Sequence, residues 1–121
     1  MTILVHVKSN TGENKMLLHI PCVGDASKVS KIGISAISQS LKDLNKPLCI
    51  EVSSIEGVFM FDGTSTLCSP SLIIVDRNTT TSPYLVGWNK PTPTRLNVNI
   101  TDLDGKSMEN LPPYFLTFVF E

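Results

Sequence analysis

The residues that first invite a chemical interpretation are two aspartates and a glycine near the end of the chain. Asp102, Asp104 and Gly105 stand in the stretch TDLDG, which looks like the start of a calcium-binding loop. A loop of the EF-hand type also needs further oxygen ligands, a bidentate acid about eight residues after the second carboxylate, and a helix on either side. Strand-like residues flank this stretch instead. The pattern therefore predicts the turn of a hairpin between two strands, in which glycine adopts a positive φ and aspartate accepts hydrogen bonds from nearby backbone N–H groups.

Three further residues are of types that bind zinc. His6 and His19 fall in neighbouring predicted strands, and Cys22 follows them. A zinc site would need all three to converge on one point. Both histidines lie on the less apolar side of their strands, which favours surface or rim positions. The three cysteines, Cys22, Cys49 and Cys68, are odd in number and form no CxxC pair, which favours buried free thiols over a disulfide framework. We therefore predict no metal and no cofactor.

Catalytic and ligand-binding motifs are sparse. No serine stands in a GxSxG elbow, no cysteine lies near a histidine with an evident orienting acid, and no glycine-rich loop opens a helix, so we expect no enzyme. Tyr84 and Trp88, in PYLVGWNKP, are candidate contacts for a ligand or partner because they could form an aromatic platform for a sugar ring. The alternative is that Tyr84 belongs to the core and Trp88 packs against its own loop.

The elements that would position these residues are short strands. In TRLNVNIT the apolar Leu96, Val98 and Ile100 alternate with polar residues, a pattern typical of a strand with one buried face. Similar stretches occur along the whole chain, separated by polar segments rich in Gly, Pro, Asn and Asp. The predicted strands cover residues 3–8, 15–20, 28–35, 47–54, 57–61, 71–75, 84–88, 94–101 and 114–120, with Leu48, Ile50 and Val52 facing inward in the fourth.

One segment has a helical spacing instead. Ile34, Ile37, Leu41 and Leu44 are three, seven and ten residues apart, which predicts at most one short helix near residues 36–45. Many short strands with turns between them indicate an all-β fold, an antiparallel β-sandwich or barrel. At 121 residues, with no long linker and no repeat, the chain is read as a single domain over residues 1–121.

Composition restricts the class of partner. The net charge of −1 and the scattered lysines give no electrostatic field for a polyanion, so no nucleic-acid partner is expected. No apolar run approaches the roughly 18 residues of a membrane span, and the first residues do not resemble a signal peptide. The sequence is therefore interpreted as a soluble protein made in the cytosol.

The final strand, YFLTFVF, is apolar on both faces. Four residues line one face: Tyr114, Leu116, Phe118 and Phe120. Phe115 and Val119 lie on the other face, with Thr117 between them. Two interpretations stay open: either the strand is central and a loop of the same chain covers its second face, or a neighbouring subunit covers it, since an exposed apolar face favours association. Phe115, Thr117 and Val119 are thus the candidate subunit interface.

With the strands placed, the chain resembles the penton-like minor capsid proteins of Polinton (Maverick) elements, adintoviruses and related DNA viruses. In the first half, Ser9-Asn10 occupies the place of that family's Ser-Asn strand end, and VSKIGISAI, residues 29–37, occupies the place of its strand of the type V-x-L-x-x-I. Later, Ser54-Ile55-Glu56 and Asp62-Gly63-Thr64 match a corner and a turn of that family. A Pro83-Tyr84 step follows, and LNVNITDLDG resembles the closing I-x-I-x-I-x-D-x-x-G before a last apolar strand.

The resemblance implies a single jelly roll that acts as a structural unit of an icosahedral shell. It implies a homo-oligomer, with a pentamer favoured, and a major capsid protein as partner. It also implies that the protein is a component of the virion, made in the host cytosol and assembled in the nucleus. A second hypothesis is a carbohydrate- or protein-binding β-sandwich, which is a viral attachment module or a host-domesticated descendant. The aromatic pair Tyr84 and Trp88 would serve that function.

Overall fold

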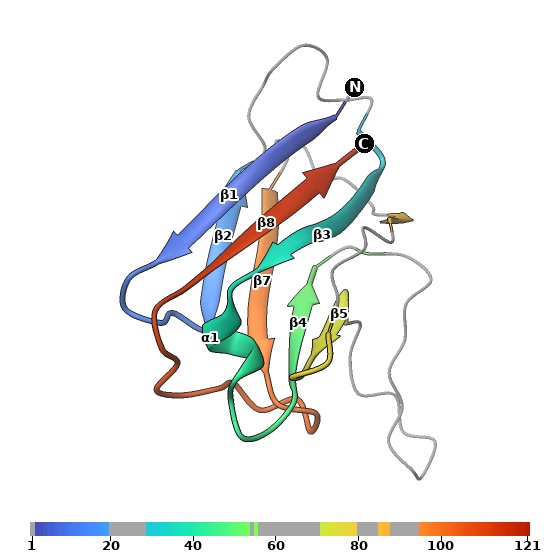
Figure 1. The fold of residues 1–121 in the computed structure, drawn as a ribbon. Coiled ribbons are helices and arrows are strands. Elements are labelled where there is room, and N and C mark those ends of the chain that lie inside the picture. The colour runs from blue at the N-terminus through green and yellow to red at the C-terminus, as the bar shows by residue number, and fades with distance from the viewer. Residues whose placement is uncertain (1, 20–28, 54, 56–70, 80–84, 88–94) are drawn as a thin grey trace, which may run out of the picture.

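The computed structural model describes residues 2–19, 29–53, 55, 71–79, 85–87 and 95–121. These residues form eight β-strands and one short helix (Figure 1). The elements in chain order are β1 (Ile3–Ser9), β2 (Lys15–His19), β3 (Lys31–Ile37), α1 (Gln39–Lys42), β4 (Leu48–Val52), β5 (Ile73–Val75), β6 (Val86–Gly87), β7 (Arg95–Thr101) and β8 (Tyr114–Phe120). The strand predicted at residues 57–61 lies outside the described residues.

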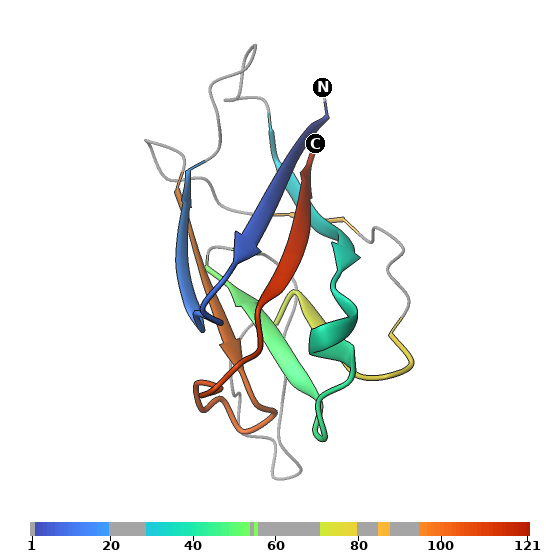
Figure 2. The ribbon, with the colours of Figure 1, turned by 60° about the vertical axis from the view of Figure 1, so that its left-hand side comes forward.

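The strands form two antiparallel sheets that pack face to face (Figure 2). The first sheet has the order β1-β8-β3-β6, and the second has the order β2-β7-β4-β5. The pairings are nested, because β1 pairs with β8, β2 with β7, β3 with β6 and β4 with β5. Such nesting arises when one long hairpin is rolled up so that its successive strand pairs enter alternate sheets. This topology is a single jelly roll, and the predicted all-β sandwich is confirmed.

The core lies between the sheets and is built by the alternation seen in the sequence. Leu96, Val98 and Ile100 of β7 are fully buried. Ile50 and Val52 of β4 lie opposite Ile100 and Val98 in the register. The inward residues of the last strand complete the core from the first sheet: Tyr114, Leu116, Phe118 and Phe120. Strand β8 is central, with β1 on one side and β3 on the other.

The predicted hairpin at the end of the chain is wrong. The turn at residues 102–105 was expected to join two paired strands, but β7 and β8 belong to different sheets. After the turn the chain forms one antiparallel bridge, between Thr101 and Ser107, and then crosses to the other layer. β1 and β2 are likewise in different sheets. Each of these connections bridges the two layers because the successive strand pairs of a jelly roll enter alternate sheets.

The predicted helix is present but shorter than its apolar spacing implied. α1 has four residues, with Leu41 buried, whereas Ile34 and Ile37 belong to β3. The register of β3 against β8 shifts between Ile34 and Ala36, so Ser35 is an extra residue in the strand. This bulge returns Ile37 to the core face, three residues after Ile34. The bulge therefore produced the helix-like spacing.

The connection between β1 and β2 packs against the segment that leads into β8. Gly12 has a φ of +71°, and a β-carbon added there would lie 2.0 Å from the carbonyl oxygen of Leu111. The Asn14 side chain donates a hydrogen bond of 2.7 Å to the Met108 carbonyl. Glycine at position 12 is therefore required both for the backbone conformation and for this close approach.

Candidate functional site

The outer face of the first sheet carries the candidate interface residues in one line along β8. Phe115 is 51% exposed, whereas Thr117 and Val119 are only 6% and 7% exposed. The chain itself thus covers two of the three positions, and Phe115 alone presents a large apolar surface. Thr117 also has a polar partner, because its hydroxyl lies 2.9 Å from Nδ1 of His6 on the neighbouring strand. Among these three residues, a contact with another molecule would therefore depend mainly on Phe115.

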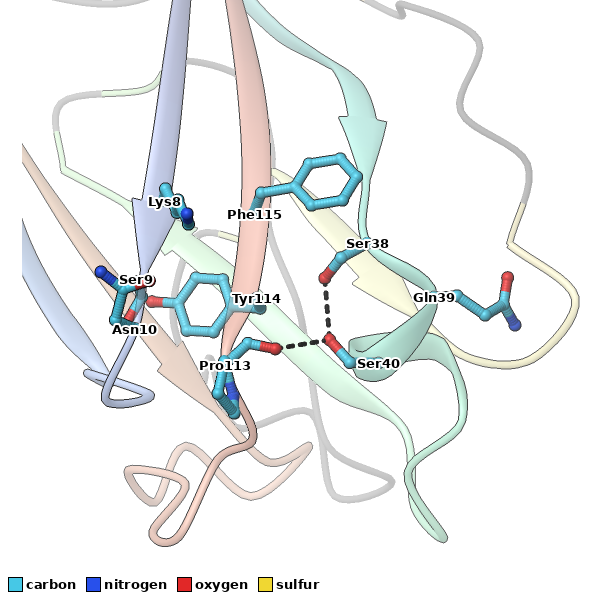
Figure 3. A pocket seen from close by; sticks show the side chains of 9 residues that line it. All are labelled: Lys8, Ser9, Asn10, Ser38, Gln39, Ser40, Pro113, Tyr114 and Phe115. Atoms are coloured by element: carbon cyan, nitrogen blue, oxygen red, sulfur yellow. Dashed lines mark hydrogen bonds between the residues drawn. The ribbon is translucent and has the colours of Figure 1, made fainter.

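Phe115 borders an open, mostly apolar groove of about 490 Å³. Figure 3 shows that three segments far apart in the sequence form its walls: the end of β1, the start of α1 and the start of β8. The residues that line it are Lys8, Ser9, Asn10, Ser38, Gln39, Ser40, Pro113, Tyr114 and Phe115. We call this hollow the Phe115 groove.

The wall of the Phe115 groove formed by α1 is fixed to β8. The Ser38 backbone N–H donates a hydrogen bond of 3.0 Å to the Phe115 carbonyl, which continues the β3–β8 pairing to the helix. The Ser40 hydroxyl donates to the Pro113 carbonyl at 2.9 Å and lies 3.0 Å from the Ser38 hydroxyl (Figure 3). These bonds hold the short helix in place although four residues would not form a stable helix alone.

The opposite wall is braced by a polar cluster around Glu13. The hydroxyls of Ser9 and Thr11 donate to its carboxylate, and the Tyr114 hydroxyl donates to its backbone carbonyl. The Ser9 hydroxyl also accepts from the Glu13 N–H at 3.0 Å. The hydrogen bonds from Ser9 and then Thr11 lower the pKa of Glu13, and burial raises the pKa of Tyr114. A carboxylate with a lowered pKa is a weak base, so this cluster is suited to shaping the wall and not to proton transfer.

The predicted turn after β7 is confirmed by its hydrogen bonds. Oδ1 of Asp102 accepts from the N–H groups of Asp104 and Lys106 at 2.9 and 3.0 Å, and Gly105 has a φ of +84°. The Lys46 ammonium lies 3.9 Å from the second carboxylate oxygen. These interactions, led by the bond from Lys106, lower the pKa of Asp102. The carboxylate therefore serves the backbone of its own turn.

The histidines occupy surface positions, as predicted. His6 lies on β1 in the first sheet and His19 on β2 in the second, and both are exposed. Cys22 lies outside the described residues. Within the described part of the chain, no group of three or more His, Cys, Asp or Glu side chains is placed to hold a metal ion. Cys49 is fully buried in β4, and Cys68 lies outside the described residues.

The aromatic platform proposed from the sequence falls where the structure describes nothing, because Tyr84 and Trp88 both lie outside the described residues. The Phe115 groove, by contrast, was only partly predicted. Phe115 stood out in the sequence, but the serines at the start of α1 and the residues at the end of β1 carry no local sign that they lie beside it. Only the jelly-roll topology brings Ser40 and Pro113, which are 73 positions apart, to one site.

The chain was compared with known proteins in three ways. No protein-family model, curated protein or solved structure matches it. Among the residues described, no helix is long and apolar enough to cross a membrane.

Proposed function

We propose that the chain is a structural virion protein, a minor capsid or penton single jelly-roll protein that assembles with copies of itself in an icosahedral shell. The observation that carries the proposal is the nested jelly-roll pairing together with one large aromatic side chain exposed on a central strand. The Polinton-type resemblance of the sequence supports the same assignment, and a pentamer is the favoured assembly. A major capsid protein is the expected partner.

The position of Phe115 supports a contact between subunits. About half of its surface is exposed in the single chain. Full burial of a phenylalanine side chain is worth roughly 1.5–3 kcal/mol, so covering the remaining half would contribute about 1 kcal/mol per subunit. Such a contact is weak alone, but closed symmetry repeats it in every subunit. The net charge of −1 allows copies to approach with little repulsion.

The Phe115 groove offers a place for this contact. It is open, and the serine hydroxyls of its wall at α1 can accept hydrogen bonds while Phe115 supplies apolar area. Interfaces combine such features, an apolar centre and a polar rim. We infer that a neighbouring copy of the chain covers the groove in the shell.

The test compares Phe115→Ser with Leu103→Ser by light scattering and negative-stain electron microscopy, with and without a co-expressed major capsid protein. Leu103 is a matched control because it is 43% exposed on the turn after β7, away from the groove. We expect Phe115→Ser to reduce assembly or incorporation while Leu103→Ser assembles like wild type. Both variants should keep the wild-type melting temperature. A wild-type chain that stays monomeric and enters no particle would refute the proposal.

The Phe115 groove also favours a second candidate, a module that binds a protein or a carbohydrate. An open apolar hollow with hydroxyl groups on one wall can hold an extended ligand. Trp88 and Tyr84 would supply a platform in the carbohydrate form of this proposal. A glycan array with wild type and Trp88→Ala separates the two functions. A sugar-specific signal that the substitution abolishes would favour the module, and a capsid protein should give no such signal.

A further inference from the structure

β1 is an open edge of the first sheet. It pairs with β8 over its whole length, from Ile3 opposite Phe120 to Ser9 opposite Tyr114, and no other described strand adjoins it. It is seven residues long and contains neither proline nor glycine. An edge strand of this kind presents a row of backbone N–H and C=O groups that can pair with another strand.

The hydrogen bonds of β8 reveal which backbone groups of β1 point to this edge. In an antiparallel sheet the N–H and C=O of one residue point to the same side. Phe115 accepts a bond from Ser38, and Glu121 exchanges two bonds with Lys31, so the odd-numbered residues of β8 face β3. The even-numbered residues of β8 therefore face β1.

The partners of those even-numbered residues on β1 are Ile3, Val5, Val7 and Ser9. By alternation, the backbone groups of Leu4, His6 and Lys8 point away from the sheet, toward the open edge. No backbone hydrogen bond from elsewhere in the described chain reaches these three residues. The edge thus offers three N–H donors and three C=O acceptors in the spacing of a β-ladder.

The apolar side chains on this side of the sandwich are also incompletely covered. Val5 and Val7 point toward the core from β1 but remain partly exposed. Met16 and Leu18 do the same from β2, which is one of the two edge strands described for the second sheet. The inward residues of the central strands β3, β4, β7 and β8 are buried. A strand added to β1 would cover these partly exposed side chains.

We propose that the strand added to β1 is β1 of a second copy of this chain, paired antiparallel about a two-fold axis at His6. In this register Leu4 lies opposite Lys8 of the partner subunit, and His6 lies opposite His6 of the partner subunit. All three residues with open backbone groups then pair, and Val5 lies opposite Val7 of the partner subunit, which continues the apolar layer. The two first sheets become one sheet of eight strands.

The register keeps like charges apart. Lys8 and Lys8 of the partner subunit are offset by four residues, about 13 Å along the strands. This distance exceeds the Debye length of about 8 Å at physiological salt, so their repulsion is screened. A lysine on an edge strand normally discourages pairing with another strand. Lys8 lies near the end of β1, so the stretch from Leu4 to Val7 contains no lysine. The Lys8 methylenes can also cover Leu4 of the partner subunit, which is 54% exposed in the single chain.

This contact is made through the open edge of β1 and not through Phe115, although Lys8 also lines the Phe115 groove, and it does not depend on a capsid function. The test is sedimentation of wild type, His6→Pro and His6→Ala over a concentration series. The His6 N–H takes no part in the β1–β8 ladder, so proline is tolerated in the fold but blocks the edge. Both variants lose the side-chain bond to Thr117, which makes alanine the matched control. Phe115→Ser is added to each of the three chains to remove the groove contact. In that background we expect the chains with His6 and with His6→Ala to sediment at twice the 13.2 kDa of one chain, and the chain with His6→Pro at 13.2 kDa.

If His6→Pro fails to fold, Leu4→Pro is a second substitution that removes a backbone N–H from the open edge of β1. Amide hydrogen exchange of the wild type is a further measurement that needs no variant. In the dimer, the amides of Leu4, His6 and Lys8 should be protected as strongly as those of Val5 and Val7. On dilution to monomer, only the first three should lose protection. Three results would overturn the proposal: wild type that is monomeric throughout, a dimer whose Leu4, His6 and Lys8 amides exchange freely, or equal dimerisation of His6→Pro and His6→Ala. If the true partner of β1 is an acidic strand of another protein, the wild type alone will be monomeric, which is the first of these results.

Discussion

Gly12→Ala should be one of the most damaging single-methyl additions to this chain. Residue 12 adopts a φ of +71°, which costs a non-glycine residue about 1–2 kcal/mol. The added β-carbon would also lie 2.0 Å from the Leu111 carbonyl oxygen, so one backbone segment must move by more than 1 Å. Forced shifts of this kind cost typically 1–3 kcal/mol. We therefore expect a loss of about 2–5 kcal/mol in the free energy of unfolding.

Gly105→Ala separates the two contributions. Gly105 has a similar φ of +84°, but a β-carbon there meets no atom within 4 Å. Only the backbone cost remains, about 1–2 kcal/mol. Urea denaturation of the two variants and wild type measures the difference, with m values checked for a common two-state transition. Equal losses for both variants would show that the contact with Leu111 does not constrain the chain and would refute the reasoning.

Two further predictions concern the polar groups near these turns. Tyr114→Phe removes the hydroxyl that donates to the Glu13 carbonyl and should lower the free energy of unfolding by about 1 kcal/mol, as measured by urea denaturation; no loss would contradict a bracing role. Asp102 has a pKa below its ordinary 3.8, so its stabilising effect is complete above that value and is lost as pH falls through the lowered folded-state pKa. Asp102→Asn keeps an acceptor for the Lys106 N–H but does not titrate. The melting temperature of this variant should therefore fall less than that of wild type between about pH 6 and pH 2. If both melting temperatures fall in parallel, the acid sensitivity belongs to other groups.

The sequence predicts the strands well because alternation is a local property. Leu96, Val98 and Ile100 face the core as their spacing indicated, and Asp102 to Gly105 form the expected turn. Alternation specifies which face of a strand is buried, but it does not specify the sheet to which the strand belongs. This is why the turn after β7 was wrongly expected to close a hairpin. Strand partners are decided by long-range packing, which one sequence does not display.

The bulge in β3 shows a second limit. A single extra residue, Ser35, moves the apolar period from two to three, and Ile34 and Ile37 then mimic one face of a helix. The candidate site likewise depends on the folded structure and not on local sequence alone. Phe115 could be recognised as an apolar residue on the second face of its strand, whereas Ser40 and Lys8 join it only after the sheets have formed. Burial of Thr117 and Val119 likewise depends on tertiary neighbours.

Lys8 belongs to both proposed contact surfaces, so the two contacts should influence each other. Its backbone groups point to the open edge of β1, while the residue also lines the groove beside Phe115, its cross-strand neighbour. Pairing of β1 with a second copy would order Lys8 and thereby prepare one wall of the groove, which lowers the entropy cost of filling it. Phe115→Ser should then weaken assembly less in a His6→Pro background than in wild type. A double-mutant cycle on assembly measures this coupling, and strictly additive effects would show that the two surfaces act separately.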